Sequence, residues 1–103
     1  MKFDQKKMLK QVQKVQQSME RIQKELAEEK IEVTVGGGVV KVVASGQQRI
    51  VEINIAPEVV NPEDIETLVD LLITAINSAL EKSQELAAQK MSSLTGGLMP
   101  GLF

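Results

Sequence analysis

The stretch IEVTVGGGVVKVVASGQQRIVEINI, residues 31–55, decides the fold. In IEVTV, β-branched apolar residues alternate with Glu and Thr, and a similar alternation returns in RIVEINI, residues 49–55. A period of two with β-branched side chains is typical of strands. Three glycines at 36–38 and a further one at Gly46 mark the two reversals, where we expect positive φ angles. The stretch predicts a three-stranded antiparallel meander over about residues 31–56.

The middle strand, VVKVVAS, is apolar on both faces except at Lys41 and Ser45. This pattern indicates that both faces of the sheet are at least partly covered. Three strands cannot hide two faces and two edges alone, and a chain of 103 residues buries a limited fraction of its surface. The sequence therefore favours a homodimer.

A helix over about residues 62–92 is predicted to follow the meander. Asn61 suits the N-cap, Pro62 the first helical position, and acids follow at Glu63 and Asp64. Capping and solvation explain these acids better than a metal site does. Glycines and a proline beyond residue 94 predict an irregular tail over residues 94–103, and so a single domain over residues 1–93.

A second helix is predicted before the meander, over about residues 2–30, where no Gly or Pro occurs. Its apolar residues follow at intervals of 4, 3, 4, 3 and 4, namely Met8, Val12, Val15, Met19, Ile22 and Leu26. A 3.5-residue repeat is typical of a narrow seam against another helix. The seam has two interpretations, packing on its own sheet and pairing with the same helix of a partner. The predicted fold class is α+β, with the order α-β-β-β-α.

Charge is distributed unevenly along the chain. Residues 2–24 carry seven bases and two acids, a net charge of +5, whereas residues 25–103 carry five bases and twelve acids, a net charge of −7. On a heptad grid with Val12 and Met19 at position a, the bases of the N-terminal helix fall at b, c and f, opposite the seam. They are Lys6, Lys7, Lys10, Lys14, Arg21 and Lys24.

A row of bases of this length can contact several DNA phosphates. At about 1.5 Å per residue, the row from Lys6 to Lys24 spans roughly 27 Å, most of a helical turn of DNA. These six residues are therefore the candidate DNA-binding site. The competing interpretation is an ordinary solvated helix surface, but seven bases to two acids differs from the mixed signs of such a surface.

Composition excludes several classes of function. The chain has no Cys and no His, which removes thiol nucleophiles, Cys–His pairs, thiolate metal sites and the usual general base. We therefore expect no enzyme, no metal, no cofactor and no small-molecule substrate. No membrane span or secretory signal is visible, so a cytoplasmic location is expected. The run of glycines at 36–38 precedes a strand and lacks G-K-[ST], so it is not a phosphate-binding loop.

The segment GGGVVKVVASGQQRIVEINIAPEVVNPEDIETLVDLL, residues 36–72, resembles the YbaB/EbfC family of bacterial nucleoid-associated proteins. Asn77 and the closing TGGLMPGLF also match the pattern of that family. One departure is Ala56, where the family usually places an acid before Pro57. This position is a strand exit, so we expect little effect on function.

The resemblance implies a homodimer of α/β/α layers whose first helices project from a central sheet body. It also implies binding of double-stranded DNA at the nucleoid in the cytoplasm, without enzymatic activity. The leading hypothesis is thus a non-enzymatic homodimer that contacts DNA phosphates through the basic face of the N-terminal helix. The alternative is a protein-interaction adaptor that uses the heptad seam and the apolar tail.

Overall fold

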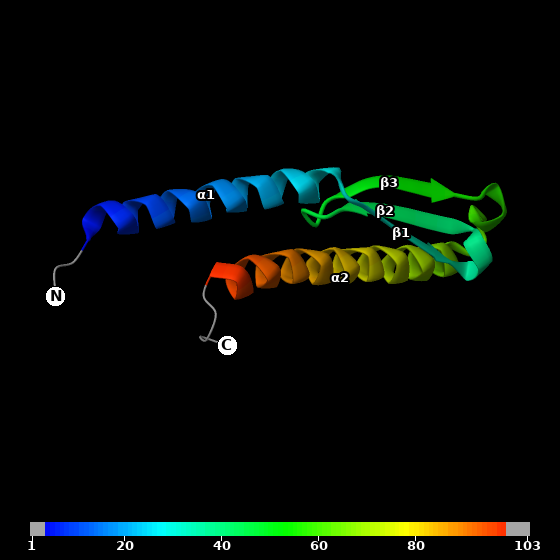
Figure 1. Cartoon of the computed structure of the whole chain (residues 1–103). Helices are drawn as coiled ribbons and strands as arrows, with labels where there is room; N and C mark the ends of the chain where they lie inside the picture. The colour runs from blue at the N-terminus through cyan, green and yellow to red at the C-terminus, as the bar shows by residue number, and fades with distance from the viewer. Residues whose placement is uncertain (1–3, 99–103) are drawn as a thin grey trace.

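A computed structural model describes residues 4–98. Along the chain, a first helix is followed by three strands and then by a second helix (Figure 1). The elements are α1 (Gln5–Glu28), β1 (Lys30–Val35), β2 (Val40–Ser45), β3 (Ile50–Ile55) and α2 (Ile65–Leu98). A glycine turn occupies Gly36–Gly38, and a single 3₁₀ turn occupies Pro57–Val59. The predicted α+β class and its α-β-β-β-α order are confirmed.

The sheet has the antiparallel order β1-β2-β3, as a meander requires. Val42 is the partner of Val33 on one side and of Ile53 on the other, so these side chains share one face. Helix α2 packs on that face and forms the core with it. The buried members of this core are Val33, Val40, Val42, Ala44, Ala75 and Ala79.

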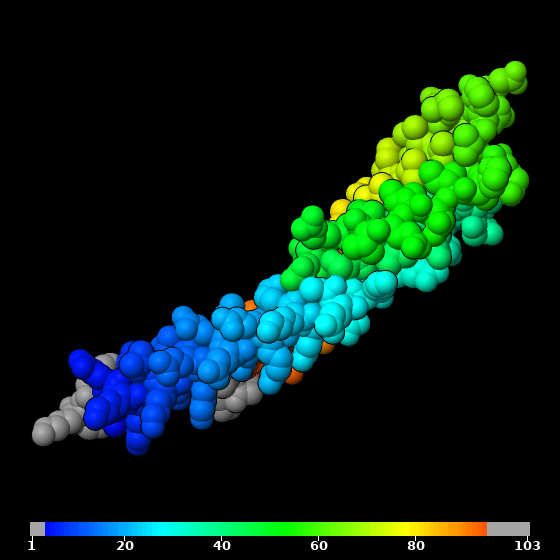
Figure 2. All heavy atoms as spheres, turned by 90° about the horizontal axis from the view of Figure 1, so that it is seen from above, coloured from blue at the N-terminus to red at the C-terminus, as the bar shows by residue number. Residues whose placement is uncertain are grey.

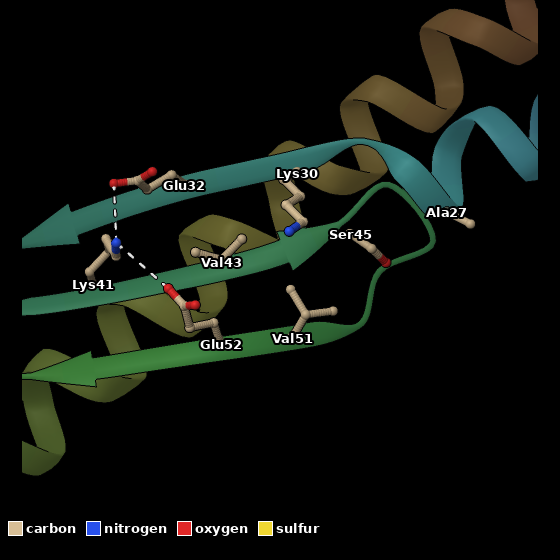
Figure 3. A pocket seen from close by; sticks show the side chains of 8 residues that line it. All are labelled: Ala27, Lys30, Glu32, Lys41, Val43, Ser45, Val51 and Glu52. Atoms are coloured by element: carbon tan, nitrogen blue, oxygen red, sulfur yellow. Dashed lines mark ion pairs between the residues drawn. The ribbon is translucent and has the colours of Figure 1, made fainter.

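The opposite face of the sheet is polar, and Figure 3 shows α2 behind the strands as seen from this side. Lys41 lies between two carboxylates, with its Nζ 3.8 Å from Glu32 Oε1 and 3.6 Å from Glu52 Oε2. Val43 is buried among its neighbours on the strands. Within the described residues a helix covers only one face of the sheet. The prediction that both faces are partly covered therefore holds for one face of the single chain.

The two reversals of the meander differ from one another. The prediction of positive φ is confirmed for the first, where all of Gly36–Gly38 have φ between +64° and +98°. It is wrong for Gly46, because the positive φ of the second reversal belongs to Gln48, at +63°. Gly46 serves a different purpose: a Cβ at this position would lie 2.7 Å from the carbonyl oxygen of Leu26. It allows the hairpin to approach the end of α1.

The limits of both helices differ from the predicted ones. Asp64, not Asn61, caps α2, since its carboxylate accepts from Thr67 N at 3.3 Å and from Thr67 Oγ1 at 2.7 Å. Asn61 closes a turn before the helix by accepting from Glu63 N. Helix α2 also runs to Leu98, past the predicted end near residue 92 and into the predicted tail. A glycine costs a helix only about 1 kcal/mol, so the pair at 96 and 97 weakens the helix without ending it.

Candidate nucleic-acid interface

Helix α1 extends from the body as a rod and makes the molecule 75 × 23 × 16 Å in size (Figures 1 and 2). Asp4 caps its start by accepting from Lys7 N at 3.2 Å. The helix ends at Glu28 and residues 1–3 lie outside the described part, so the predicted range of 2–30 is shortened by two residues at its C-terminal end. The side chains of residues 4–14 are all exposed, so every side of this part of the rod is accessible.

The predicted bases lie on one side of this rod. All six are exposed: Lys6, Lys7, Lys10, Lys14, Arg21 and Lys24. With 3.6 residues per turn they fall within a sector of about 100°, and the apolar seam occupies the opposite side. We call this group of six the basic ridge.

Ion pairing differs along the basic ridge. Arg21 Nε lies 3.7 Å from Glu25 Oε1, an exposed pair one helical turn apart. Within residues 4–98, the five lysines of the ridge make no ion pair. Between Gln5 and Met19 the helix carries no acid, and Lys7, Lys10 and Lys14 line a shallow depression of about 320 Å³. The N-terminal half of the ridge therefore carries the least compensated positive charge.

Contacts at the C-terminal end of α1 fix the direction of the rod. The last four carbonyls of a helix lack partners within the helix, and the β2–β3 hairpin supplies a donor for one of them, as Gly46 N donates to Leu26 O at 2.8 Å. The Gln47 side chain adds a contact one turn earlier by donating to Gln23 O at 3.1 Å. From α2, Lys90 Nζ lies 3.2 Å from Glu25 Oε2.

A buried hydroxyl joins the same hairpin to α2. Ser83 Oγ donates to Ser45 O at 2.7 Å and accepts from Gln48 N at 2.9 Å, and the residue is fully buried. Gln48 N also donates to Ser45 O at 3.1 Å, so the hydroxyl adds a second contact to each of these two backbone groups. Helix α1, the hairpin and α2 are thus tied into one joint, and this joint sets where the basic ridge points.

Replacing Gly46 by Ala will destabilise the protein by about 2–3 kcal/mol, because the new Cβ overlaps the Leu26 backbone. Gly37→Ala is the matched control: it has open space but a φ of +74°, so strain alone costs about 1 kcal/mol. Urea denaturation measures both. Equal losses in the two variants would contradict the steric role of Gly46.

Two further bases lie outside α1, where the heptad pattern does not apply. Lys30 begins β1 as the partner of Ser45, and Arg49 O accepts from Ser45 N at 2.8 Å, so the two residues flank the same end of β2. Both are exposed, and neither makes an ion pair within residues 4–98. No periodicity marks them, since only the folded hairpin brings them to the base of the rod.

A pocket of about 300 Å³ on the polar face of the sheet does not suit an anion (Figure 3). Its walls include Glu32 and Glu52, which already hold Lys41 between them. No group of three metal-ligating side chains occurs in the described part of the chain. Among residues 4–98, neither helix is long and apolar enough to cross a membrane.

Comparison with known proteins agrees with the resemblance seen in the sequence. Nucleoid-associated proteins of Desulforamulus reducens and Pelotomaculum thermopropionicum are 59% and 54% identical to this chain over 98 residues. Both matches cover 94% of this chain and 93% of the relative. The crystal structure of an uncharacterized protein from Helicobacter pylori shares the fold, with a TM-score of 0.84 at 18% identity over 92% of this chain and 100% of that one.

A family model matches nearly the whole length of the chain. Residues 1–98 match the model of the YbaB/EbfC DNA-binding family. The description of this family and the names of the relatives are those of DNA-binding, nucleoid-associated proteins and not of enzymes. The chain therefore belongs to the YbaB/EbfC DNA-binding family.

Proposed function

We propose that the protein is a non-enzymatic homodimer that binds double-stranded DNA through phosphate contacts from the basic ridge of α1. The observation that carries the proposal is a row of exposed lysines without ion pairs on one side of a projecting helix. Lysine ammonium groups bind phosphates with little dependence on base sequence. Membership of a DNA-binding family supports the choice of DNA as the ligand.

A second exposed surface supports the homodimer. Strand β3 is an edge of the sheet, and α2 covers it far less than it covers β1 and β2. Apolar side chains that are 38% to 55% exposed gather on β3, on the segment after it and on the first half of α2. They are Ile53, Ile55, Val60, Ile65, Val69 and Ile73, and we call them the β3–α2 apolar surface. A contiguous apolar surface of this kind marks an interface.

Two copies joined at this surface bring two sheets together with an α2 on each, which gives the proposed α/β/α layers. Each protomer then adds one basic ridge, so that a duplex meets two rows of lysines. Recognition through phosphates predicts a broad sequence preference. The names of the relatives support a site of action at the nucleoid, in the cytoplasm.

A salt titration of binding to a random duplex tests this proposal. If each dimer neutralises about six phosphates, log K falls against log salt with a slope near −5. Fluorescence anisotropy of a labelled duplex measures the slope. Absence of binding even at low salt would contradict the proposal and favour the alternative, a protein-interaction adaptor using the seam of α1 and the apolar tail.

A further inference from the structure

The apolar seam of α1 is covered at one end and bare at the other. Ile22 and Leu26 are 5% and 2% exposed where α1 meets α2 and the hairpin. Towards the N-terminus the seam residues Met8, Val12 and Met19 are between 41% and 50% exposed, and Val15 between them is half-buried. We call the three exposed residues the bare seam. Figure 1 shows that α1 continues beyond the end of α2, so no described element accompanies its first turns.

The side chains that border the bare seam are uncharged. On the heptad grid the flanking e and g positions of residues 5–19 are Leu9, Gln11, Gln16 and Ser18. Charges at e and g positions decide which helices pair, and like charges there repel. All lysines of this segment lie at b, c or f, on the far side of the helix. Two copies of α1 can therefore meet along this side although each carries a strong positive charge.

We infer that the bare seam binds the bare seam of a second copy of this chain, α1 against α1. A seam with a 3.5-residue period, neutral flanks and outward lysines is complementary to itself. A different protein with an acidic helix would be expected to pair with bases at the e and g positions of α1. Residues 5–19 carry no base at these positions. Glutamines on both sides can exchange hydrogen bonds across the pair.

This contact is distinct from the proposed homodimer interface. The β3–α2 apolar surface includes the start of α2, at the opposite end of the molecule from the first turns of α1 (Figure 1). A chain with two separate self-complementary surfaces links copies alternately through one and the other. Paired α1 helices also present their basic ridges on opposite sides, so each pair holds two duplex segments together. This last consequence, the bridging of DNA, rests on the proposed function.

Disulfide cross-linking tests the pairing, because the natural chain has no Cys. Val12→Cys places a thiol in the bare seam, and Gln17→Cys places one at an f position on the same stretch of helix, facing away. Upon oxidation, we expect covalent dimers at least about tenfold faster from Val12→Cys, since a disulfide needs Cβ atoms close together. Equal rates for the two variants overturn the inference.

Two further arms separate this inference from the proposed function. Combined with Ile73→Asp, which disrupts the β3–α2 apolar surface, oxidised Val12→Cys should have the native mass of two chains. With Ile73 intact it should have the mass of four or more. If the wild type binds no DNA, the proposed function fails while the cross-linking result still decides the pairing.

A third arm concerns the role of the pairing. Val12→Gln should bind a single duplex as the wild type does, but lose most of its ability to retain a second, labelled duplex on bead-bound DNA. A basic amphipathic helix also suits an anionic membrane surface. If phosphatidylglycerol vesicles capture the wild type but not Val12→Gln, and the cross-linking rates are equal, the bare seam binds lipid and the inference is wrong.

Discussion

Replacing Lys7, Lys10 and Lys14 together by Glu will weaken binding to a random duplex at least about a thousandfold, beyond detection by mobility shift. The three ammonium groups make no ion pair within residues 4–98, and the helix carries no acid between Gln5 and Met19, so their positive charge is little compensated. Reversal replaces three positive charges with three negative ones, a change of six units of charge per chain, so attraction becomes repulsion. Each side chain is exposed, and therefore the fold and the native mass should be unchanged.

A matched pair of single variants separates position from net charge. Lys10→Glu and Lys82→Glu change the chain by the same two charges, and both lysines are exposed, but Lys82 lies on α2. We expect a marked loss of affinity for the first and little for the second. Retained binding in a well-folded triple variant would show that the basic ridge is not the DNA-binding site.

Replacing Ile73 by Asp will dissociate the homodimer without unfolding the protomer. Ile73 is 54% exposed within the single chain, so a carboxylate there stays hydrated until a second copy covers it. Covering an unpaired charge costs several kcal/mol, which raises the dissociation constant at least about a hundredfold. Light scattering after gel filtration measures the native mass.

Thr74→Asp provides the control for this variant. It adds the same charge one residue later, at an exposed position on a different side of α2. The native mass of the control should remain that of the wild type, and the DNA affinity of Ile73→Asp should fall because a monomer offers only one basic ridge. If Ile73→Asp leaves the mass unchanged, the protomers do not associate through the β3–α2 apolar surface.

The local patterns of the sequence were sufficient for the fold. Alternation in IEVTV and RIVEINI predicts strands because side chains on a strand point to opposite faces in turn, and the paired register agrees with it. The 3.5-residue spacing of the seam predicts a helix, because residues at this spacing lie on one side of a helix. The basic ridge follows from the same spacing, since residues seven apart return to one side of a helix.

What the sequence could not supply depends on contacts between distant residues. A glycine between two strands, such as Gly46, is typical of a turn with positive φ. Only the folded chain shows that the missing side chain makes room for the Leu26 carbonyl. Helix α2 ends later than the sequence predicts, because glycines weaken a helix without ending it. The seam is continuous in sequence, whereas only Ile22 and Leu26 at its C-terminal end are fully buried, because that end alone lies against the body.

The central claim is that the lysines of α1 contact DNA phosphates, and salt slopes of single variants test it most directly. Removing one phosphate contact reduces the slope by about one per protomer. Lys10→Gln should therefore move the slope of the dimer from near −5 to near −3, and Lys82→Gln should leave it unchanged. Identical slopes for the wild type and both variants would contradict the account.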